Sequence, residues 1–312
     1  MKWIKRGLIF RPDGNFEWMS HHAAVPTADK VNDEVIRIYF GPRDNQNRTV
    51  TTFIEVEADN PSNVLYVHNK PALSLGKLGC FDDSGVTPCW IVNYKNKKYL
   101  YYAGWNVGVT VPYRLCIGLA FSDDGGLSYT RYSEGPILGR SVQDPYLCSA
   151  PCVLVDNGLW KMWYLSGTGW TIIKGKPEPL YLVKYAESQD GINWDRSGLI
   201  CIDYKFDKEA IGRPCVIKEG GIYKMWYSYK GSVDYRTNKE QSYRIGYAES
   251  TDGKKWTRKD EEVGIDRSDA GWDSVMIEYP YVYEHKGKKY MLYCGNKFGE
   301  SGFGYAELIE EA

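Results

Sequence analysis

The chain has 312 residues, enough for one large all-β domain or for two smaller domains. Its 39 Lys and Arg residues nearly balance its 40 Asp and Glu residues, which indicates neither a basic surface for nucleic acid nor an acidic tail for a cationic partner. No stretch has the length and apolarity of a membrane-spanning helix or of a secretory signal, so we expect a cytoplasmic protein with no nucleic-acid or membrane partner.

Prolines recur along the chain at intervals of 62 to 66 residues, at Pro26, Pro88, Pro151, Pro214 and Pro280. Each proline lies in a short strand-like run, and a second strand rich in aromatic residues follows it, as at 97–105 and 159–167. This spacing predicts five repeats of one β-rich unit.

Three of the repeats continue into a third strand and a turn with the pattern Ser-x-Asp-Gly. The aspartates are Asp124, Asp190 and Asp252. In such a turn the glycine takes a positive φ and the aspartate accepts hydrogen bonds from its own turn. Their recurrence therefore predicts a structural role for these aspartates.

The fifth repeat ends at its third strand, around residues 303–310, with no fourth strand after it. Residues 3–9, WIKRGLI, match WDRSGLI at 194–200, so the N-terminus is expected to supply the missing strand and to remove an exposed edge. We therefore predict an all-β fold: one five-bladed β-propeller domain over 1–312, with about four antiparallel strands per blade.

Three of the eight cysteines, Cys89, Cys152 and Cys215, each follow a repeat proline directly. Equivalent positions in different blades lie too far apart for disulfide geometry. We expect these thiols to be reduced, buried and space-filling.

In a propeller, the innermost strands line the central funnel, and here those strands contain the repeat prolines. The segments that lead into the prolines differ from blade to blade, as one asymmetric ligand would require. Their carboxylates are candidates for the acid and base of glycosyl transfer, with capping or ion pairing as the alternative. We predict catalytic roles for Asp83, the preferred acid, and for Asp82, Glu278 and Glu209, and substrate-binding roles for Asp144 and Asp273.

Other side chains are candidates for direct contact with a sugar. His21 and His22 take the corresponding place in the first blade, where hydrogen bonding to substrate or to a carboxylate competes with metal binding and with packing between blades. Guanidinium groups near the funnel would hold an anionic ligand, or would form salt bridges between blades. Trp105 and Trp170 end aromatic strands, where they would stack on a sugar ring or pack internally. The charged candidates are Arg43, Asp44, Arg48, Arg213 and Arg236.

The repeats, the turns and the segment FDDSGVTP from Phe81 resemble the five-bladed propeller superfamily of arabinanases, β-xylosidases, invertases, levansucrases and mannoside phosphorylases. In the phosphorylase branch one aspartate donates a proton, and Arg and His groups bind phosphate. The resemblance implies these roles for Asp83 or Asp82, and for the phosphate ligands Arg43, Arg48 and His22.

Two further segments bear on the resemblance. The segment IEYP from Ile277 is similar to the Glu-Cys-Pro acid motif of invertases, although it occurs in the fifth blade. The hydrolytic branches carry an aspartate base in the first blade, where this chain has His21 and His22.

The sequence thus predicts a glycoside hydrolase or phosphorylase that acts on a sugar or oligosaccharide, neutral or anionic, with phosphate as a partner in the second case and with no cofactor or metal. The alternatives are a non-catalytic propeller that binds a carbohydrate or nucleotide sugar, and a structural scaffold.

Overall fold

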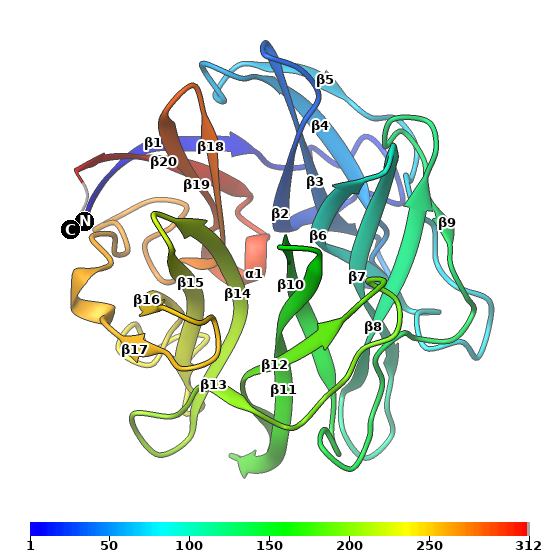
Figure 1. The fold of residues 1–312 in the computed structure, drawn as a ribbon, viewed down its shortest axis with the longest axis vertical. Coiled ribbons are helices and arrows are strands. Elements are labelled where there is room, and N and C mark those ends of the chain that lie inside the picture. The colour runs from blue at the N-terminus through cyan, green and yellow to red at the C-terminus, as the bar shows by residue number, and fades with distance from the viewer. Residues whose placement is uncertain (311–312) are drawn as a thin grey trace.

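A computed structural model describes residues 1–310, and residues 311 and 312 of the predicted domain lie outside the described part. Five four-stranded antiparallel sheets form a ring around a central axis (Figure 1). The expected five-bladed propeller with four strands per blade is therefore confirmed.

The first strand of each blade lies nearest the axis and the fourth lies outermost (Figure 1). The first two blades contain β2 (His21–Lys30), β3 (Val35–Arg43), β4 (Thr52–Glu57) and β5 (Val64–Val67), then β6 (Gly85–Tyr94), β7 (Lys97–Val107), β8 (Tyr113–Ser122) and β9 (Thr130–Arg131). The third and fourth blades contain β10 (Cys148–Asp156), β11 (Leu159–Ile173), β12 (Lys176–Ser188) and β13 (Ile200–Ile202), then β14 (Glu209–Glu219), β15 (Ile222–Gly231), β16 (Arg244–Ser250) and β17 (Thr257–Arg258).

The fifth blade contains β18 (Glu278–His285), β19 (Lys288–Cys294) and β20 (Phe303–Glu310), and β1 (Lys2–Phe10) pairs antiparallel with β20 as its outermost strand. Trp3 of β1 is buried edge-to-face against Trp226, with ring centroids 6.1 Å apart. The predicted closure of the ring by the N-terminal strand is confirmed. The short helices η1 (Asp260–Glu262) and α1 (Asn296–Gly299) are the helical segments among residues 1–310, and neither is long and apolar enough to span a membrane.

The aromatic second strands are buried on both faces because each blade packs between two neighbours. In β11, for example, Met162, Trp163 and Tyr164 are successive residues and are all fully buried. The indole Nε1 of Trp163 donates a hydrogen bond to the carbonyl of Gly253 in the turn of the next blade, at 2.7 Å. Aromatic composition thus provides both the core and the contacts between blades.

The Ser-x-Asp-Gly turns are structural, as predicted. In the third blade, Asp190 accepts hydrogen bonds from the backbone N–H groups of Ile192 and Asn193, both at 2.8 Å. The Gly191 carbonyl accepts from the Tyr101 hydroxyl of the preceding blade at 2.7 Å. The turns therefore connect neighbouring blades.

A register shift interrupts the pairing of every innermost strand next to its repeat proline. In four blades the residue before the proline has a left-handed backbone, with φ of 56° at Val25, 46° at Ala150, 54° at Arg213 and 58° at Tyr279. Such bulges turn a side chain away from the direction that regular pleating would give it. All four residues line the central cavity.

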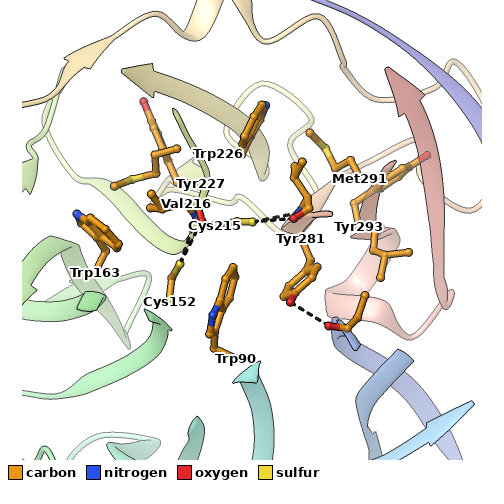
Figure 2. Close-up of a cluster of buried hydrophobic side chains, with 14 of the residues drawn as sticks. Trp90, Cys152, Trp163, Cys215, Val216, Trp226, Tyr227, Tyr281, Met291 and Tyr293 are labelled. Atoms are coloured by element: carbon orange, nitrogen blue, oxygen red, sulfur yellow. Dashed lines mark hydrogen bonds between the residues drawn. The ribbon is translucent and has the colours of Figure 1, made fainter. Parts of the chain in front are cut away.

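Beyond these bulges the axis is filled (Figure 2). The rings of Trp90 and Tyr281 contact each other with centroids 4.8 Å apart, and both side chains are buried. Cys152 and Cys215 lie beside them, and their sulfurs accept backbone hydrogen bonds from the next blade at 3.2 and 3.1 Å. All eight cysteines are free, and Cys89, Cys152 and Cys215 are buried as expected. The cavity is therefore a funnel that ends at this packed core.

Candidate active site

A cavity of about 380 Å³ occupies the funnel above the bulges. Its lining includes three guanidinium groups, those of Arg43, Arg213 and Arg236, and no aspartate or glutamate among the residues that the structure describes. The rest of the wall is mostly apolar, with aromatic and aliphatic side chains and a few small polar ones. The aromatic lining residues are Trp105, Tyr113, Tyr181, Tyr235, Tyr243, Tyr279 and Phe298. The lining thus combines positive charge with flat aromatic faces.

Arg213 lies at the blind end of the cavity. Its side chain is only 1% exposed and lies over the ring of Tyr281 at 5.7 Å. Its Nη2 donates to the Pro26 carbonyl at 3.5 Å and to Thr27 Oγ1 at 3.3 Å, while Nε and Nη1 have no hydrogen-bond partner within residues 1–310.

Two further arginines lie nearer the mouth. Arg43, at the end of β3, is half-buried, and burial lowers the pKa of its guanidinium. Arg236 lines the cavity and also pairs with Glu178 at 2.5 Å. Asp44 and Arg48 form a local ion pair at 2.8 Å in the loop that follows, and neither belongs to the cavity lining.

Glu278, the first residue of β18, is fully buried beside pocket-lining Tyr279, and its carboxyl oxygens make no hydrogen bond of good geometry in the described chain. Tyr279 and the Phe298 backbone are close enough to act on its pKa by hydrogen bonding. Burial raises the pKa of this carboxyl well above its ordinary value, and nearby Lys230 and Arg43 offset the effect only in part. Burial therefore favours the protonated form of Glu278, which lies directly behind the funnel wall.

Lys230 lies behind the same wall, 2% exposed, with its ammonium 3.7 Å from the ring centroid of Tyr235 and within 6 Å of those of Tyr181 and Tyr243. Its hydrogen bond goes to the Gly231 carbonyl at 3.4 Å. Burial lowers the pKa of Lys230 to about 7.

Of the two predicted stacking tryptophans, Trp105 lines the cavity, whereas Trp170 packs against Tyr113 with ring centroids 5.5 Å apart and lies outside the lining. Trp105 packs flat on Gly85, where an added Cβ would lie 1.7 Å from the indole Nε1. A glycine is required at this position so that the indole can face the funnel.

His21 and His22 lie at the start of β2, with their Nδ1 atoms 2.5 Å apart. His22 is buried, and its pKa is lowered to about 3 by burial first and then by the charge of Arg43. Neither histidine belongs to the cavity lining, although His21 is the register partner of Arg43. No group of three potential metal-ligating His, Cys, Asp or Glu side chains occurs within residues 1–310.

The expectation that several carboxylates converge on the funnel is wrong for four of them. Asp82, Asp144, Glu209 and Asp273 are buried, and each is paired with a cation from the outermost strand of its own blade or the segment joined to it. These pairs, which we call the blade latches, are Asp82–Arg131 at 2.8 Å, Asp144–Arg196 at 2.9 Å, Glu209–Arg258 at 2.8 Å and Asp273–Lys5 at 2.7 Å.

The physical reason is the direction of the side chains. Three latch carboxylates precede an innermost strand and Glu209 begins one, but each turns outward along its blade. In three blades the carboxylate accepts a hydrogen bond from a tyrosine 20 residues later. Charge and hydrogen bonds stabilise these buried carboxylates where they stand, although Oδ1 of Asp82 has no hydrogen-bond partner in the described chain. Their assignment to the funnel therefore has no geometric basis.

Asp83, the preferred acid, is half-buried and also lies outside the cavity lining. Its carboxylate accepts hydrogen bonds from Ser84 Oγ at 2.9 Å and from the Gly79 N–H at 3.0 Å, which fix a turn at the entrance to β6. Of the predicted catalytic residues, Glu278 is the one that the structure places next to the cavity.

We expect Asp144→Ala to lower the free energy of unfolding by about 3–5 kcal/mol, because the variant leaves a buried ion-pair network without its acceptor. Asp144 accepts from Arg196, Lys184, Ser166 and Tyr164. Asp144→Asn keeps a hydrogen-bond acceptor, so its free energy of unfolding should fall by less. Urea titrations of the three proteins measure the difference, and an unchanged midpoint for Asp144→Ala would contradict the latch.

Sequence reasoning missed Glu178, Lys230 and the tyrosine wall of Tyr181, Tyr235 and Tyr243. The length of two segments was the available signal in the sequence. Residues 159–188 form a strand pair much longer than its counterparts in the other blades. Residues 232–243 extend the fourth blade between its second and third strands. Both extensions build one side of the funnel. The occurrence of Tyr181, Tyr235 and Tyr243 outside the repeat pattern was a second signal that these segments line the funnel.

No family model matches the chain. Two curated relatives match along nearly its whole length. Uncharacterized protein MT1551 of Mycobacterium tuberculosis (strain CDC 1551 / Oshkosh) is 39% identical over 309 residues, which cover 99% of this chain and 99% of the relative. Uncharacterized protein Rv1502 of Mycobacterium tuberculosis (strain ATCC 25618 / H37Rv) is 38% identical over the same length and coverage.

Solved structures with the same fold are more distant in sequence. A glycosyl hydrolase from Bacteroides ovatus superimposes with a TM-score of 0.71 at 18% identity, covering 100% of this chain and 94% of that one. A thermostable family-43 glycoside hydrolase gives a TM-score of 0.66 at 19% identity, covering 94% and 90%. The chain belongs to the family of Uncharacterized proteins MT1551 and Rv1502, and it has the five-bladed propeller fold found in these glycoside hydrolases.

Proposed function

We propose that this protein is a glycoside-active enzyme that binds the end of a saccharide in the central funnel, with Glu278 as the proton donor. The observation that carries the proposal is the environment of Glu278: a fully buried carboxyl without a well-formed hydrogen bond, whose pKa burial raises, beside the wall of the cavity on the propeller axis. Glycosyl transfer requires a protonated acid of this kind to protonate the leaving oxygen. The shared fold with glycoside hydrolases supports the same proposal.

The proton reaches the funnel on the side of Tyr279, the lining residue next to Glu278. In the proposed reaction the bond between the anomeric carbon and the leaving oxygen breaks, and that oxygen takes the proton of Glu278. A nucleophile forms the new bond to the anomeric carbon. Glu278 is left as a carboxylate, which Lys230 stabilises by its charge until solvent returns the proton.

The lining favours phosphate over water as this nucleophile. Water needs a general base, and no aspartate or glutamate is among the described lining residues. Phosphate carries its own negative charge, so it needs no base, and guanidinium groups bind it well. Arg43, with His21 beside it at the mouth, is the proposed phosphate ligand.

The shape of the funnel favours cleavage at a chain end. Its closed end at Trp90 and Tyr281 stops a saccharide from passing through, and a volume of about 380 Å³ holds only a short piece of one. The substrate is therefore proposed to enter by its terminal sugar.

Sugar release from a panel of oligosaccharides and glycosides, with and without inorganic phosphate, tests the proposal. We expect release that depends on phosphate and yields a sugar 1-phosphate, detected by mass spectrometry. Release at the same rate without phosphate would make the protein a hydrolase. Binding with no release from any substrate would favour the second candidate, a non-catalytic sugar-binding propeller, which the complete burial of Glu278 supports.

We also propose a cytoplasmic location. The support is that all eight cysteines are free, a state that a reducing compartment maintains.

A further inference from the structure

The guanidinium of Arg213 is the least satisfied charge at the funnel. It is 1% exposed, two of its three nitrogens lack a hydrogen-bond partner, and no carboxylate in the described chain forms an ion pair with it. A guanidinium is always protonated and offers five N–H donors. An unpaired buried charge is costly to the folded state.

Other buried arginines of this protein are paired. Arg37 is 4% exposed and binds Glu55 at 2.6 Å, and the Arg258 side chain is 9% exposed and binds Glu209 at 2.8 Å. Neighbouring thiols do not neutralise Arg213 either, because burial raises the pKa of Cys89, which also lines the cavity, to about 11. Among these buried arginines, it is therefore Arg213, at the funnel, that lacks a negatively charged partner.

The backbone places this charge on the propeller axis. Arg213 occupies the bulge before its repeat proline with φ of 54°, while the equivalent residues in three other blades, Val25, Ala150 and Tyr279, are uncharged and have the same left-handed backbone. The aromatic ring of Tyr281 closes the funnel beneath it. Only the group at the leading end of a ligand can reach this point.

We propose that the blind end of the funnel is a subsite for an oxyanion carried by the terminal sugar itself, a carboxylate or a phosphate ester, held by charge-assisted hydrogen bonds from Arg213. This inference rests on the proposed function and narrows its substrate to an acidic sugar. A free phosphate co-substrate fits the position poorly, because it would be trapped beneath the sugar and could leave only after it. Arg43, nearer the mouth, is the better ligand for such a phosphate.

Isothermal titration calorimetry without turnover tests the subsite. The probes are D-glucose, D-mannose and D-galactose, their uronic acids and their 6-phosphates, and inorganic phosphate alone. We expect wild-type protein to bind at least one acidic sugar roughly 10- to 100-fold more tightly than its neutral parent. Arg213→Met should remove that difference by weakening binding of the acidic sugar far more than binding of the neutral one. Arg213→Lys keeps the charge and should retain part of the difference.

Thermal unfolding separates this role from a structural one. Arg213→Met should raise the melting temperature, because it removes an unpaired buried charge. The matched control Arg37→Met should lower it, because it leaves Glu55 unpaired, and should not alter the preference for acidic sugars.

The remaining results overturn the subsite. One such result is equal affinity for neutral and acidic sugars, and another is a preference for acidic sugars that persists in Arg213→Met. A third is inorganic phosphate that binds at Arg213 as tightly as any acidic sugar. Charge-dependent binding without turnover would support the subsite and contradict the proposed enzymatic activity. Turnover of neutral glycosides that Arg213→Met leaves intact would support the enzymatic activity and contradict the subsite.

Discussion

Glu278→Gln should lower kcat on the substrate found in the release panel by roughly 10²- to 10⁴-fold, because a carboxamide cannot donate the proton that the leaving oxygen requires. The variant should remain folded, since glutamine matches the size of the neutral carboxyl that it replaces in a fully buried site. Steady-state kinetics on the two proteins measure the effect. If Asp83→Asn abolishes turnover and Glu278→Gln does not, the acid is Asp83.

The pH dependence gives an independent control on this assignment. Turnover requires protonated Glu278, so kcat/KM should fall on the alkaline side as pH rises through the raised pKa of this group. Because folding raises that pKa above 4.5, the native state binds more protons than the unfolded chain, and stability from this group is lost as pH rises above that value. Glu278→Gln lacks this loss, so it should gain stability relative to wild type on going from pH 5 to neutral pH.

Deletion of residues 1–10 should abolish cooperative unfolding. The deletion removes β1, exposes the edge of β20, and takes away both Trp3 and Lys5, the partner of buried Asp273. Losing a buried Trp side chain alone costs about 3–5 kcal/mol, a large share of the roughly 5–15 kcal/mol that stabilises a typical domain. Circular dichroism during heating measures the loss, and an unchanged transition would show that the ring does not depend on this strand.

Two point variants and one peptide control this experiment. Trp3→Ala should lose most of the stability that the strand provides, whereas Leu8→Ala, at a side chain that is 40% exposed, should lose much less. A synthetic peptide of residues 1–10 should restore the transition of the truncated protein, because a free strand can pair with the open sheet edge.

The fold was predictable because its determinants are local and recur. A proline in each innermost strand, aromatic residues in each second strand and Ser-x-Asp-Gly turns are visible without knowledge of three-dimensional contacts. The match between residues 3–9 and 194–200 likewise predicted that the N-terminal strand closes the propeller ring. The bulges were not visible, because the left-handed backbone at Val25, Ala150, Arg213 and Tyr279 occurs in four different residue types.

The site was harder to predict because it depends on the direction of side chains. The latch carboxylates lie just before or at the start of funnel strands. Their partners, however, lie 49 to 52 residues later in the second, third and fourth blades, in the outermost strand or the segment that leads to it. The recurrent spacing of 20 residues from Asp82 to Tyr102 and from Asp144 to Tyr164 would have marked them as structural. Glu278 and Arg213 share the opposite property: each breaks the pattern of its repeat position.

The closure of the ring also sets the order of events during synthesis. Among the described strands β1 leaves the ribosome before the others and its partner β20 after them, and the Arg6–Glu307 ion pair between them spans 301 positions. At about 5–20 residues per second, the first strand waits roughly 15–60 s for its partner. During that time Trp3, Ile4 and Ile9 have no sheet to join, so the nascent chain presents an unpaired apolar strand until β20 has been made.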